Sequence, residues 1–418
     1  MTPLLASRRF LPLFATQFLG ACNDNLLKNA LVMLVTYRIA GSGGAQLLVT
    51  LAAGLFILPF FLFSATAGQL ADKIDRARLA RFVKLAEICL MVIAGAGFAL
   101  SSVPLLLFAL FGMGVHSTFF GPIKYALLPQ HLRDDELLAG NGYIEAGTFL
   151  AILLGTIIGG LLVLKAGGRA WVSSVMIALA LSGYAASRAI PSAPPPEPQL
   201  ALDWNLARQT WRIVGFSRDD RSVFACILGI SWFWLVGATY LSQFAPFVKD
   251  TLHAAPEVVT LFLTIFSVGI GIGSFLCNKL LGGEMESSYV PPAAFGMAVF
   301  GIDLYLASGA ARAGASLTGW REFTSALPGL RVMFDLVMIA ICGGIYIVPL
   351  YAIMQHRSAA RHRARIIAAN NVVNALFMAA AALLTLAMLS LKCTIPEVFL
   401  VVACGNVAAA LACRRYVT

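Results

Sequence analysis

Long apolar runs dominate the sequence, and each is about as long as the helix that crosses a lipid bilayer. A hydrocarbon core of about 30 Å takes roughly 20 apolar residues per helix, because in lipid each backbone polar group must bond within its own helix. Twelve windows fit this description: 10–37, 45–71, 79–100, 103–128, 137–164, 169–189, 221–248, 256–281, 288–309, 330–355, 364–390 and 394–413. Hydrophobic residues make up 59% of the 418 and charged residues only 12%, whereas about a quarter are charged in soluble chains. The sequence therefore predicts an all-α membrane protein with twelve transmembrane helices.

Basic residues are distributed unequally between the two sides of these spans. With the N-terminus placed inside, 20 of the 30 Lys and Arg residues fall inside and 8 outside, while Lys28 and Lys124 lie within spans. Cytoplasmic loops carry the excess of Lys and Arg, so both termini are predicted to be cytoplasmic. The net charge of +10 is then a topology signal, and no nucleic-acid partner is expected.

A Pro-rich stretch separates the sixth span from the seventh and divides the chain into two six-helix halves, residues 1–189 and 221–418. The linker, residues 190–220, continues with Trp204 and Trp211 interleaved with arginines, a pattern typical of an amphipathic helix on a membrane surface. We interpret it as a cytoplasmic connector between the halves.

The two halves are related in sequence. GPIKYALLPQHL (121–132) and NGYIEAG (141–147) match VPLYAIMQHR (348–357) and NNVVNAL (370–376) at a nearly constant offset. The matched pairs are Pro122 and Pro349, Tyr125 and Tyr351, Gln130 and Gln355, Asn141 and Asn370, and Glu145 and Asn374. A parallel repeat of this kind predicts two halves related by an axis along the membrane normal, with a substrate site between them near the midplane.

The loop after the second span, GQLADKIDRAR (68–78), resembles the signature loop of the major facilitator superfamily, G-x-x-x-D-[RK]-x-G-R-[RK]. The matching residues are Gly68, Asp72, Lys73 and Arg76. The loop departs from the signature at Asp75 and Ala77. An acidic residue at a helix end that faces basic loop residues can latch two halves in one state, so we assign these four residues to gating.

Two charged residues interrupt the first span, in the stretch CNDNLLKNA. A charge at the bilayer centre costs about 2.5–3.5 kcal/mol, so such residues usually face the bundle interior and have a partner. Asp24 and Lys28 lie one helical turn apart on one face, so they either form a structural pair or bind substrate or an ion. In the second case Asp24 holds a sodium ion with Asn23 and Asn25 nearby, or meets the ammonium of a head group.

Lys124 and Glu145 lie on either side of the hairpin between spans four and five and are expected to meet across it. Their counterparts in the second half are the uncharged Leu350 and Asn374. The charges are therefore expected to serve a task of the first half, with transport favoured over a structural pair. We place Tyr125 and Asn141 in the same site.

The aromatic run ISWFWLVGATYLSQF (230–244) in span seven is a candidate lining for a lipophilic site. Its candidate residues are Trp232, Trp234, Tyr240 and Gln243. Ordinary packing is nearly as good an explanation.

The remaining polar residues of the spans are given structural roles. Glu87, Asp303 and Asp335 are expected near helix ends, where they cap or reach toward water, and His116 is expected to be an interior, hydrogen-bonded histidine. Gly155, Gly159 and Gly160 are expected to permit close helix packing.

No catalytic or metal-binding constellation is recognisable. The eight cysteines all lie in or at the ends of apolar runs without a C-x-x-C pair, which argues against a metal site or disulfide framework. We expect no enzyme activity, no cofactor and no resident metal.

Several stretches together narrow the resemblance. CNDNLLKNAL, FFGPIKYALLPQHL, LLAGNGYIEAGTFLAILLGTIIGG and ILGISWFWLVGATYLSQF are similar to the bacterial lysophospholipid transporter group of the major facilitator superfamily, and especially to the transporter portion of fused acyltransferase/acyl-ACP synthetase proteins. The resemblance implies flipping of lysophospholipids such as lyso-phosphatidylethanolamine from the outer to the inner leaflet of the bacterial inner membrane. No enzyme domain follows the last span, so the implied partner is a separate acyltransferase/acyl-ACP synthetase.

Two other functions remain open. A proton-coupled exporter of drugs or lipophiles would use Asp24 or Glu145 as its protonation site, although span four lacks the arginine and span five the G-P dipeptide that such exporters commonly carry. A non-transporting scaffold for a lipid enzyme is the other, and charges inside the spans argue against it.

Overall fold

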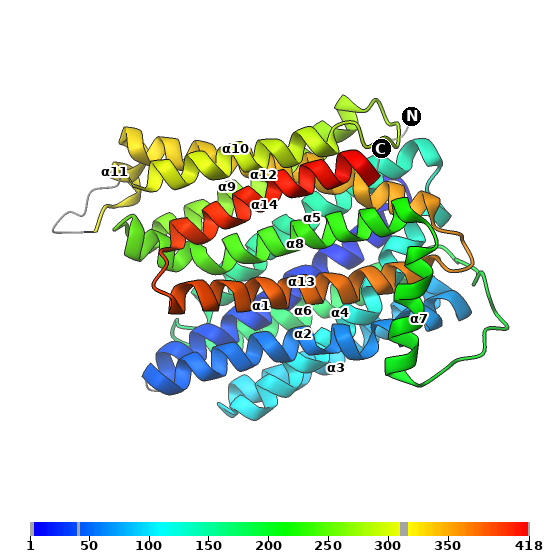
Figure 1. The fold of residues 1–418 in the computed structure, drawn as a ribbon. Helices are drawn as coiled ribbons and strands as arrows, with labels where there is room; N and C mark the ends of the chain where they lie inside the picture. The colour runs from blue at the N-terminus through cyan, green and yellow to red at the C-terminus, as the bar shows by residue number, and fades with distance from the viewer. Residues whose placement is uncertain (1–3, 40–41, 310–316, 417–418) are drawn as a thin grey trace. The chain divides into compact units, whose positions relative to one another are not determined.

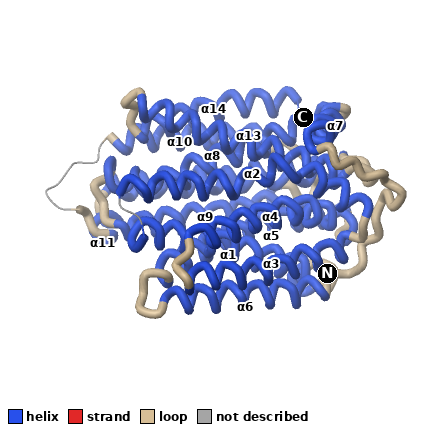
Figure 2. The backbone as a smooth tube through the Cα atoms, turned by 90° about the horizontal axis from the view of Figure 1, so that it is seen from below, coloured by secondary structure: helices blue, strands red, loops and turns tan. Residues whose placement is uncertain are grey.

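The computed structural model describes residues 4–39, 42–309 and 317–416. Within these ranges the chain is helical and has no β-strand beyond one isolated bridge between Ala254 and Thr318 (Figures 1 and 2). The long helices are α1 (Leu11–Leu34), α2 (Ser42–Lys73), α3 (Arg76–Ala99), α4 (Val103–His131), α5 (Asp134–Leu162), α6 (Gly168–Arg188), α8 (Arg221–Pro246), α9 (Pro256–Leu280), α10 (Val290–Ser308), α12 (Leu327–Arg357), α13 (Arg363–Ser390) and α14 (Ile395–Tyr416). Shorter helices are α7 (Leu206–Arg218) and α11 (Trp320–Ser325). Each of the twelve predicted windows falls on one long helix, which confirms the all-α membrane fold.

Hydropathy singles out α1 among these helices. Within the described residues, eleven helices are long and apolar enough to cross a membrane, and α1 is not one of them. Its 24 residues extend about 36 Å at 1.5 Å per residue, which is enough to span. The polar residues between Asn23 and Asn29 lower its mean hydropathy, so α1 differs from the other spans in polarity and not in length.

Helix starts at the loop ends are set by side-chain caps. Asp75 accepts a hydrogen bond from the backbone N of Arg78 at the start of α3, and Asp220 accepts from the backbone N of Ser222 and Val223 at the start of α8. Such caps satisfy backbone donors that lack partners in the first turn. Asp75, which departs from the superfamily signature, therefore has a structural role as the cap of α3.

The chain groups into two compact units. The first, unit 1, comprises residues 1–140, 150–219 and 355–372, and the second, unit 2, comprises residues 141–149, 220–354 and 373–418. The two sequence halves stay a proposal. The units follow them except at two pieces of chain, one in α5 and one that joins α12 to α13.

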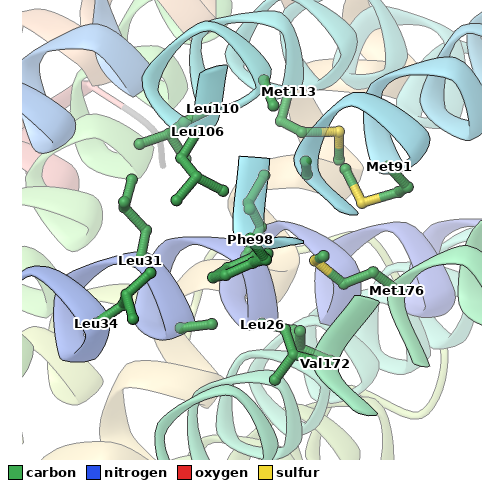
Figure 3. Packing of buried hydrophobic residues seen from close by; sticks show 14 of the residues in the cluster. Leu26, Leu31, Leu34, Met91, Phe98, Leu106, Leu110, Met113, Val172 and Met176 are labelled. Carbon is green, nitrogen blue, oxygen red and sulfur yellow. The ribbon is translucent and has the colours of Figure 1, made fainter. Parts of the chain in front are cut away.

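Unit 1 is built around apolar side chains from α1, α3, α4 and α6. Figure 3 shows Leu26 and Leu31 of α1 packed with Phe98 of α3, Leu110 of α4 and Met176 of α6, all at most 1% exposed. Between helices in lipid, such side chains stabilise the unit through close van der Waals packing, because lipid is as apolar as they are. This cluster holds α1 against the rest of the unit.

The linker and α7 also belong to unit 1. Helix α7 packs against α2 (Figure 1), and its Ile213, which is fully buried, contacts Ala65 of α2 and Ala368 of α13. Trp204 and Trp211 on the other side are 66% and 76% exposed. The linker thus contains a helix with one face packed on the protein, and its place on the cytoplasmic membrane surface stays a prediction.

Unit 2 has an aromatic core. Tyr240 of α8 stacks on Phe399 of α14 with ring centroids 4.6 Å apart, and Phe244 contacts Phe262 and Phe266 of α9 edge-on. The red helix α14 of Figure 1 runs beside α10. These contacts join α8, α9, α10 and α14.

Glycines allow α5 to lie against the backbone of α1. A Cβ on Gly155 would lie 2.3 Å from the carbonyl oxygen of Cys22, and one on Gly159 would lie 2.4 Å from that of Leu26. A Cβ on Gly160 would find its nearest neighbour, Met33 Cγ, only at 4.0 Å. The predicted close packing is therefore a property of Gly155 and Gly159, and Gly160 has room.

We predict that Gly159→Ala lowers the thermal stability of the purified protein, because the added methyl group forces α1 and α5 apart. Overpacking of this kind costs about 1–3 kcal/mol. Gly160→Ala, the neighbouring control, should leave the melting temperature within error of the native protein. Equal melting temperatures for the two variants would show that α1 and α5 do not pack through Gly159.

Candidate substrate and gating sites

One face of α1 carries polar side chains that are only partly buried. Asp24, Asn25, Lys28 and Asn29 are all half-buried, whereas Asn23 is fully buried. Residues four apart in a helix share a face, so Asp24 and Lys28 form one edge of this stripe.

Asp24 has one engaged and one free carboxylate oxygen. Ser117 of α4 donates a hydrogen bond to its Oδ2 at 2.5 Å, whereas its Oδ1 is buried and accepts no hydrogen bond from the described residues. No ion pair among those residues joins Asp24 to Lys28. Lys28 Nζ lies instead 5.9 Å from the ring centroid of Phe56. The structural pair that the spacing allowed is not formed here.

The asparagines beside Asp24 use their amides elsewhere. Asn25 and Asn29 donate to carbonyl oxygens one turn back, those of Ala21 and Asn25, and Asn29 also donates to Thr156. Asn23 points into the unit. No group of three or more His, Cys, Asp or Glu residues in the described chain is arranged to hold a metal ion.

A buried ion cluster lies next to this stripe, and we call it the Glu87 cluster: Lys84, Glu87, His116 and Asn23. Glu87 Oε2 is paired with Lys84 Nζ and lies 3.1 Å from His116 Nε2, and Glu87 Oε1 accepts from Asn23 Nδ2 at 2.8 Å. All four side chains are at most 5% exposed. The expectation that Glu87 caps a helix end was wrong, because Glu87 is the twelfth of 24 residues in α3.

Sequence reasoning missed Lys84 as well. The charge bias places Lys84 among the 20 basic residues on the inside, but the side chain is fully buried. A Cβ on Gly183 would come within 2.8 Å of its Nζ and a Cβ on Gly20 within 3.1 Å, so two glycines leave room for the ammonium. The available signal was the Lys-x-x-Glu spacing within a predicted span, which places both charges on one face.

The predicted gating residues come together around the carboxylate of Asp72. Its Oδ1 lies 2.9 Å from Arg76 Nη2 and its Oδ2 lies 3.0 Å from Arg365 Nε. The backbone N atoms of Ala364 and Arg365 at the start of α13 also donate to it. All three charged side chains are at most 4% exposed. A carboxylate at a helix N-terminus is stabilised by the unsatisfied N–H groups there.

Gly68 and Lys73 support this ion network in different ways. A Cβ on Gly68 would lie 2.8 Å from that of Ala368 and 2.9 Å from the Cα of Arg365, so glycine lets α2 approach α13. Lys73 Nζ donates to the carbonyl of Leu200 in the linker at 2.8 Å.

A linker residue that sequence reasoning did not single out completes the network. Glu197 pairs with Arg365 Nη2 and, at 3.1 Å, with Arg361 Nε, and its backbone N donates to the carbonyl of Asp72. Burial alone would raise the pKa of Glu197, but the guanidinium groups of Arg365 and Arg361 outweigh it and hold that pKa below the ordinary value of glutamate. The visible signal was RHRAR at 361–365, a basic run that required acidic partners.

The second group of predicted site residues is divided between α4 and α5. Lys124 is half-buried, with its Nζ 4.6 Å from the ring centroid of Tyr125, while Asn141 and Glu145 are fully buried. Lys124 belongs to unit 1 and Glu145 to unit 2, so their pairing stays a prediction.

The aromatic residues of α8 do not share one surface. Trp232 Nε1 donates to Asn406 at 2.7 Å, Trp234 Nε1 donates to Tyr351 at 3.2 Å, and Tyr240 is enclosed in the aromatic core. Gln243 donates a hydrogen bond to its neighbour Ser242. Packing accounts for Tyr240 in this structure, and the substrate role of the α8 residues stays a prediction.

Two carboxylates of unit 2 differ sharply. Asp303 is held by Arg331 through both of its oxygens, which explains its presence in α10. Asp335 is fully buried, and neither of its oxygens accepts a hydrogen bond from the described residues. Asp335 interacts electrostatically with both Asp303 and Arg331, so its carboxyl group adjoins their ion pair.

The chain resembles known transporters in sequence and in fold. The family model of the Major Facilitator Superfamily matches residues 13–383. The lysophospholipid transporter LplT of Enterobacter sp. (strain 638) is 27% identical over 364 residues, which cover 84% of this chain and 81% of that protein. LplT of Salmonella paratyphi B is 27% identical over 368 residues, covering 84% and 80%.

Two solved structures share the fold at low sequence identity. The human organic anion transporter MFSD10 has a TM-score of 0.76 at 13% identity, with 97% of this chain and 98% of that chain covered. A bacterial homologue of the iron transporter ferroportin, in the outward-facing state, has a TM-score of 0.71 at 15% identity, with 98% and 99% covered.

We predict that Glu197→Gln flattens the dependence of melting temperature on pH in the acid range. A carboxylate whose pKa is lowered by folding contributes stability that is present above its ordinary pKa, about 4.3, and is lost as pH falls through the lowered value. Melting curves between about pH 7 and about pH 3 measure this slope. Glu257→Gln, at an exposed site without an ion pair among the described residues, should keep the native slope. A Glu197→Gln slope equal to the native one would contradict the ion pairs described here.

Proposed function

Because this chain belongs to the Major Facilitator Superfamily, we propose that it is a lysophospholipid transporter that works by alternating access. Its curated relatives carry that name, and at 27% identity the name alone does not fix the substrate. The substrate assignment therefore has to rest on the chemistry of the spans.

The observation that carries the proposal is the free Oδ1 of Asp24. A buried carboxylate oxygen without a donor leaves part of its desolvation penalty unmet, and a ligand with a cationic donor would meet it. Lys28 lies on the same face, without an ion-pair partner among the described residues, and supplies a positive charge for an anionic group. One turn of α1 thus offers a negative and a positive site to a zwitterion.

A lysophospholipid with an ethanolamine head group fits this pair. Its ammonium would bind Asp24, and its phosphate would bind Lys28. We also propose that Lys124, Tyr125, Asn141 and Glu145 take part in transport. A single acyl chain needs an apolar path open to lipid, and the spans supply little lining for a small hydrophilic solute.

The proposed direction of transport is the one that the resemblance implies, and the charge bias supplies the sidedness of the chain. With both termini in the cytoplasm, the ion network of Asp72, Arg76, Arg365 and Glu197 would close the cytoplasmic end of the path. The lysolipid would enter from the outer leaflet of the inner membrane and leave to the inner leaflet. An acyltransferase that restores the second chain there would consume the product and keep transport downhill.

The head-group assignment predicts that Asp24→Asn impairs transport of lyso-phosphatidylethanolamine more than that of lyso-phosphatidylglycerol, whose head group has no ammonium. Losing one charge-assisted hydrogen bond should reduce uptake of the first lipid about tenfold. The measurement is uptake of each labelled lysolipid by proteoliposomes that contain the purified protein.

Lys28→Met is the matched variant, and it should impair both lipids alike because both carry the phosphate. Equal impairment by Asp24→Asn, accompanied by loss of any sodium or proton dependence, would indicate a coupling cation at Asp24. Native uptake of both lipids by Asp24→Asn would remove Asp24 from the site.

The proposed topology predicts that a cysteine at Gln199, which is exposed in the linker, reacts only from the cytoplasmic side. The experiment uses Gln199→Cys in a variant without the eight native cysteines and a membrane-impermeant maleimide on intact and opened cells. Labelling of intact cells from the outside would reverse the topology and the direction of transport.

A further inference from the structure

The Glu87 cluster links three helices through one carboxylate and a fourth helix through Asn23. Glu87 on α3 accepts from Asn23 of α1 and contacts Lys84 of its own helix and His116 of α4. The Nδ2 of Asn23 also donates to the carbonyl oxygen of Met176 on α6 at 3.2 Å. The proposed function uses none of the four cluster residues.

Two residues of this cluster are the immediate neighbours of the Asp24 site. Asn23 precedes Asp24 on α1, and His116 precedes Ser117 on α4. Successive side chains of an α-helix point about 100° apart. Asn23 and His116 both face Glu87. Asp24 and Ser117, each one residue further along its helix, therefore point about 100° away from that direction. In this position Ser117 donates the 2.5 Å hydrogen bond to Asp24. One carboxylate therefore sets the rotation of both partners in that bond.

Stability alone does not explain an ionised cluster at this place. Replacing a buried ion pair by apolar residues of similar size is often neutral or stabilising, and the surrounding core of α1, α3, α4 and α6 is already apolar. Yet both Gly20 and Gly183 leave space for the Lys84 ammonium. We interpret the cluster as setting the orientation of the side chains and helices around Glu87, since ionic hydrogen bonds constrain geometry more than apolar contacts do.

We propose that Glu87, held by Lys84, is a positioning residue that orients Asp24 toward Ser117 and leaves the other oxygen of Asp24 free for the lysolipid. This inference rests on the proposed function and deepens it. Glu87 acts on the substrate only through Asp24.

Two double variants test the role of the Glu87 oxygen. Both variants remove the same two charges, and they differ only in whether an acceptor oxygen remains. Lys84→Met with Glu87→Gln removes both charges but keeps an amide oxygen that accepts from Asn23. Lys84→Met with Glu87→Leu removes the acceptor as well. Binding of lyso-phosphatidylethanolamine to the purified protein should weaken about tenfold in the Leu pair and less than about twofold in the Gln pair, whereas lyso-phosphatidylglycerol should bind the two pairs alike.

The same pairs in an Asp24→Asn background decide whether Glu87 acts through Asp24. Residues that act as a unit are not additive, so the Leu pair should cause no further loss of binding in that background. A second, full loss on top of Asp24→Asn would overturn the positioning role. If the Leu pair does not fold, Asn23→Leu takes its place, because it keeps the Lys84–Glu87 pair and removes the hydrogen bonds from Asn23 to Glu87 and to the carbonyl of Met176.

A third measurement does not depend on a lysolipid. In a variant without native cysteines, Asp24→Cys should react with aminoethyl methanethiosulfonate at clearly different rates in the Gln and Leu backgrounds, because only the Gln background holds α1 in its native rotation. Equal rates would overturn the inference. Failure of the otherwise native protein to bind any lysolipid, with the rates still different, would instead reject the proposed function and leave the positioning role intact.

Discussion

A carboxylate in the middle of a membrane-spanning helix is tolerated only where donors replace the water it has lost, and Glu87 illustrates that constraint. Even on lenient scales, a charge at this depth costs about 2.5–3.5 kcal/mol. Glu87 offsets this with the ammonium of Lys84 and the amide of Asn23, and the imidazole of His116 lies beside it. Each of these groups sits at a defined position on its helix. The contacts that stabilise the buried charge therefore also set the rotation of α1 and α4 about their axes within unit 1.

A second buried carboxylate, Asp72 at the loop end of unit 1, is also surrounded by donors. Asp72 is as deeply buried as Glu87, and two guanidinium groups and two backbone N–H groups at the start of α13 engage it. The linker adds Glu197, so that Arg365 is shared by two carboxylates. Ion pairs of this kind can break and re-form together, which is compatible with the proposed gating role. Asp24 stands apart from both carboxylates, because one of its oxygens accepts no hydrogen bond from the described residues.

Much of this arrangement could be predicted from the sequence, and the reason lies in the lipid. Apolar length alone places the twelve spans, and the signature loop marks Asp72 and Arg76 as an interacting pair. Partners far apart in sequence were not predictable. Nothing near Asp72 identifies Arg365, and Lys84 reads as a loop charge until the packing of α3 against α1 and α6 is known. The sequence predicts Glu87 near a helix end because the apolar window begins at residue 79, whereas α3 already begins at Arg76 with polar residues. The Asp24–Lys28 spacing was compatible with a pair, and only the position of Phe56 and Ser117 shows that each side chain turns to a different neighbour.

The central claim is that the free oxygen of Asp24 is the place where the head group of the substrate binds. An experimental structure of the purified protein with lyso-phosphatidylethanolamine bound tests it most directly. The account predicts the head-group nitrogen at about 3 Å from Asp24 Oδ1, with the phosphate near Lys28 and with Asn23 and His116 still turned toward Glu87. A head group held elsewhere, with Asp24 Oδ1 bonded to Lys28, would contradict it.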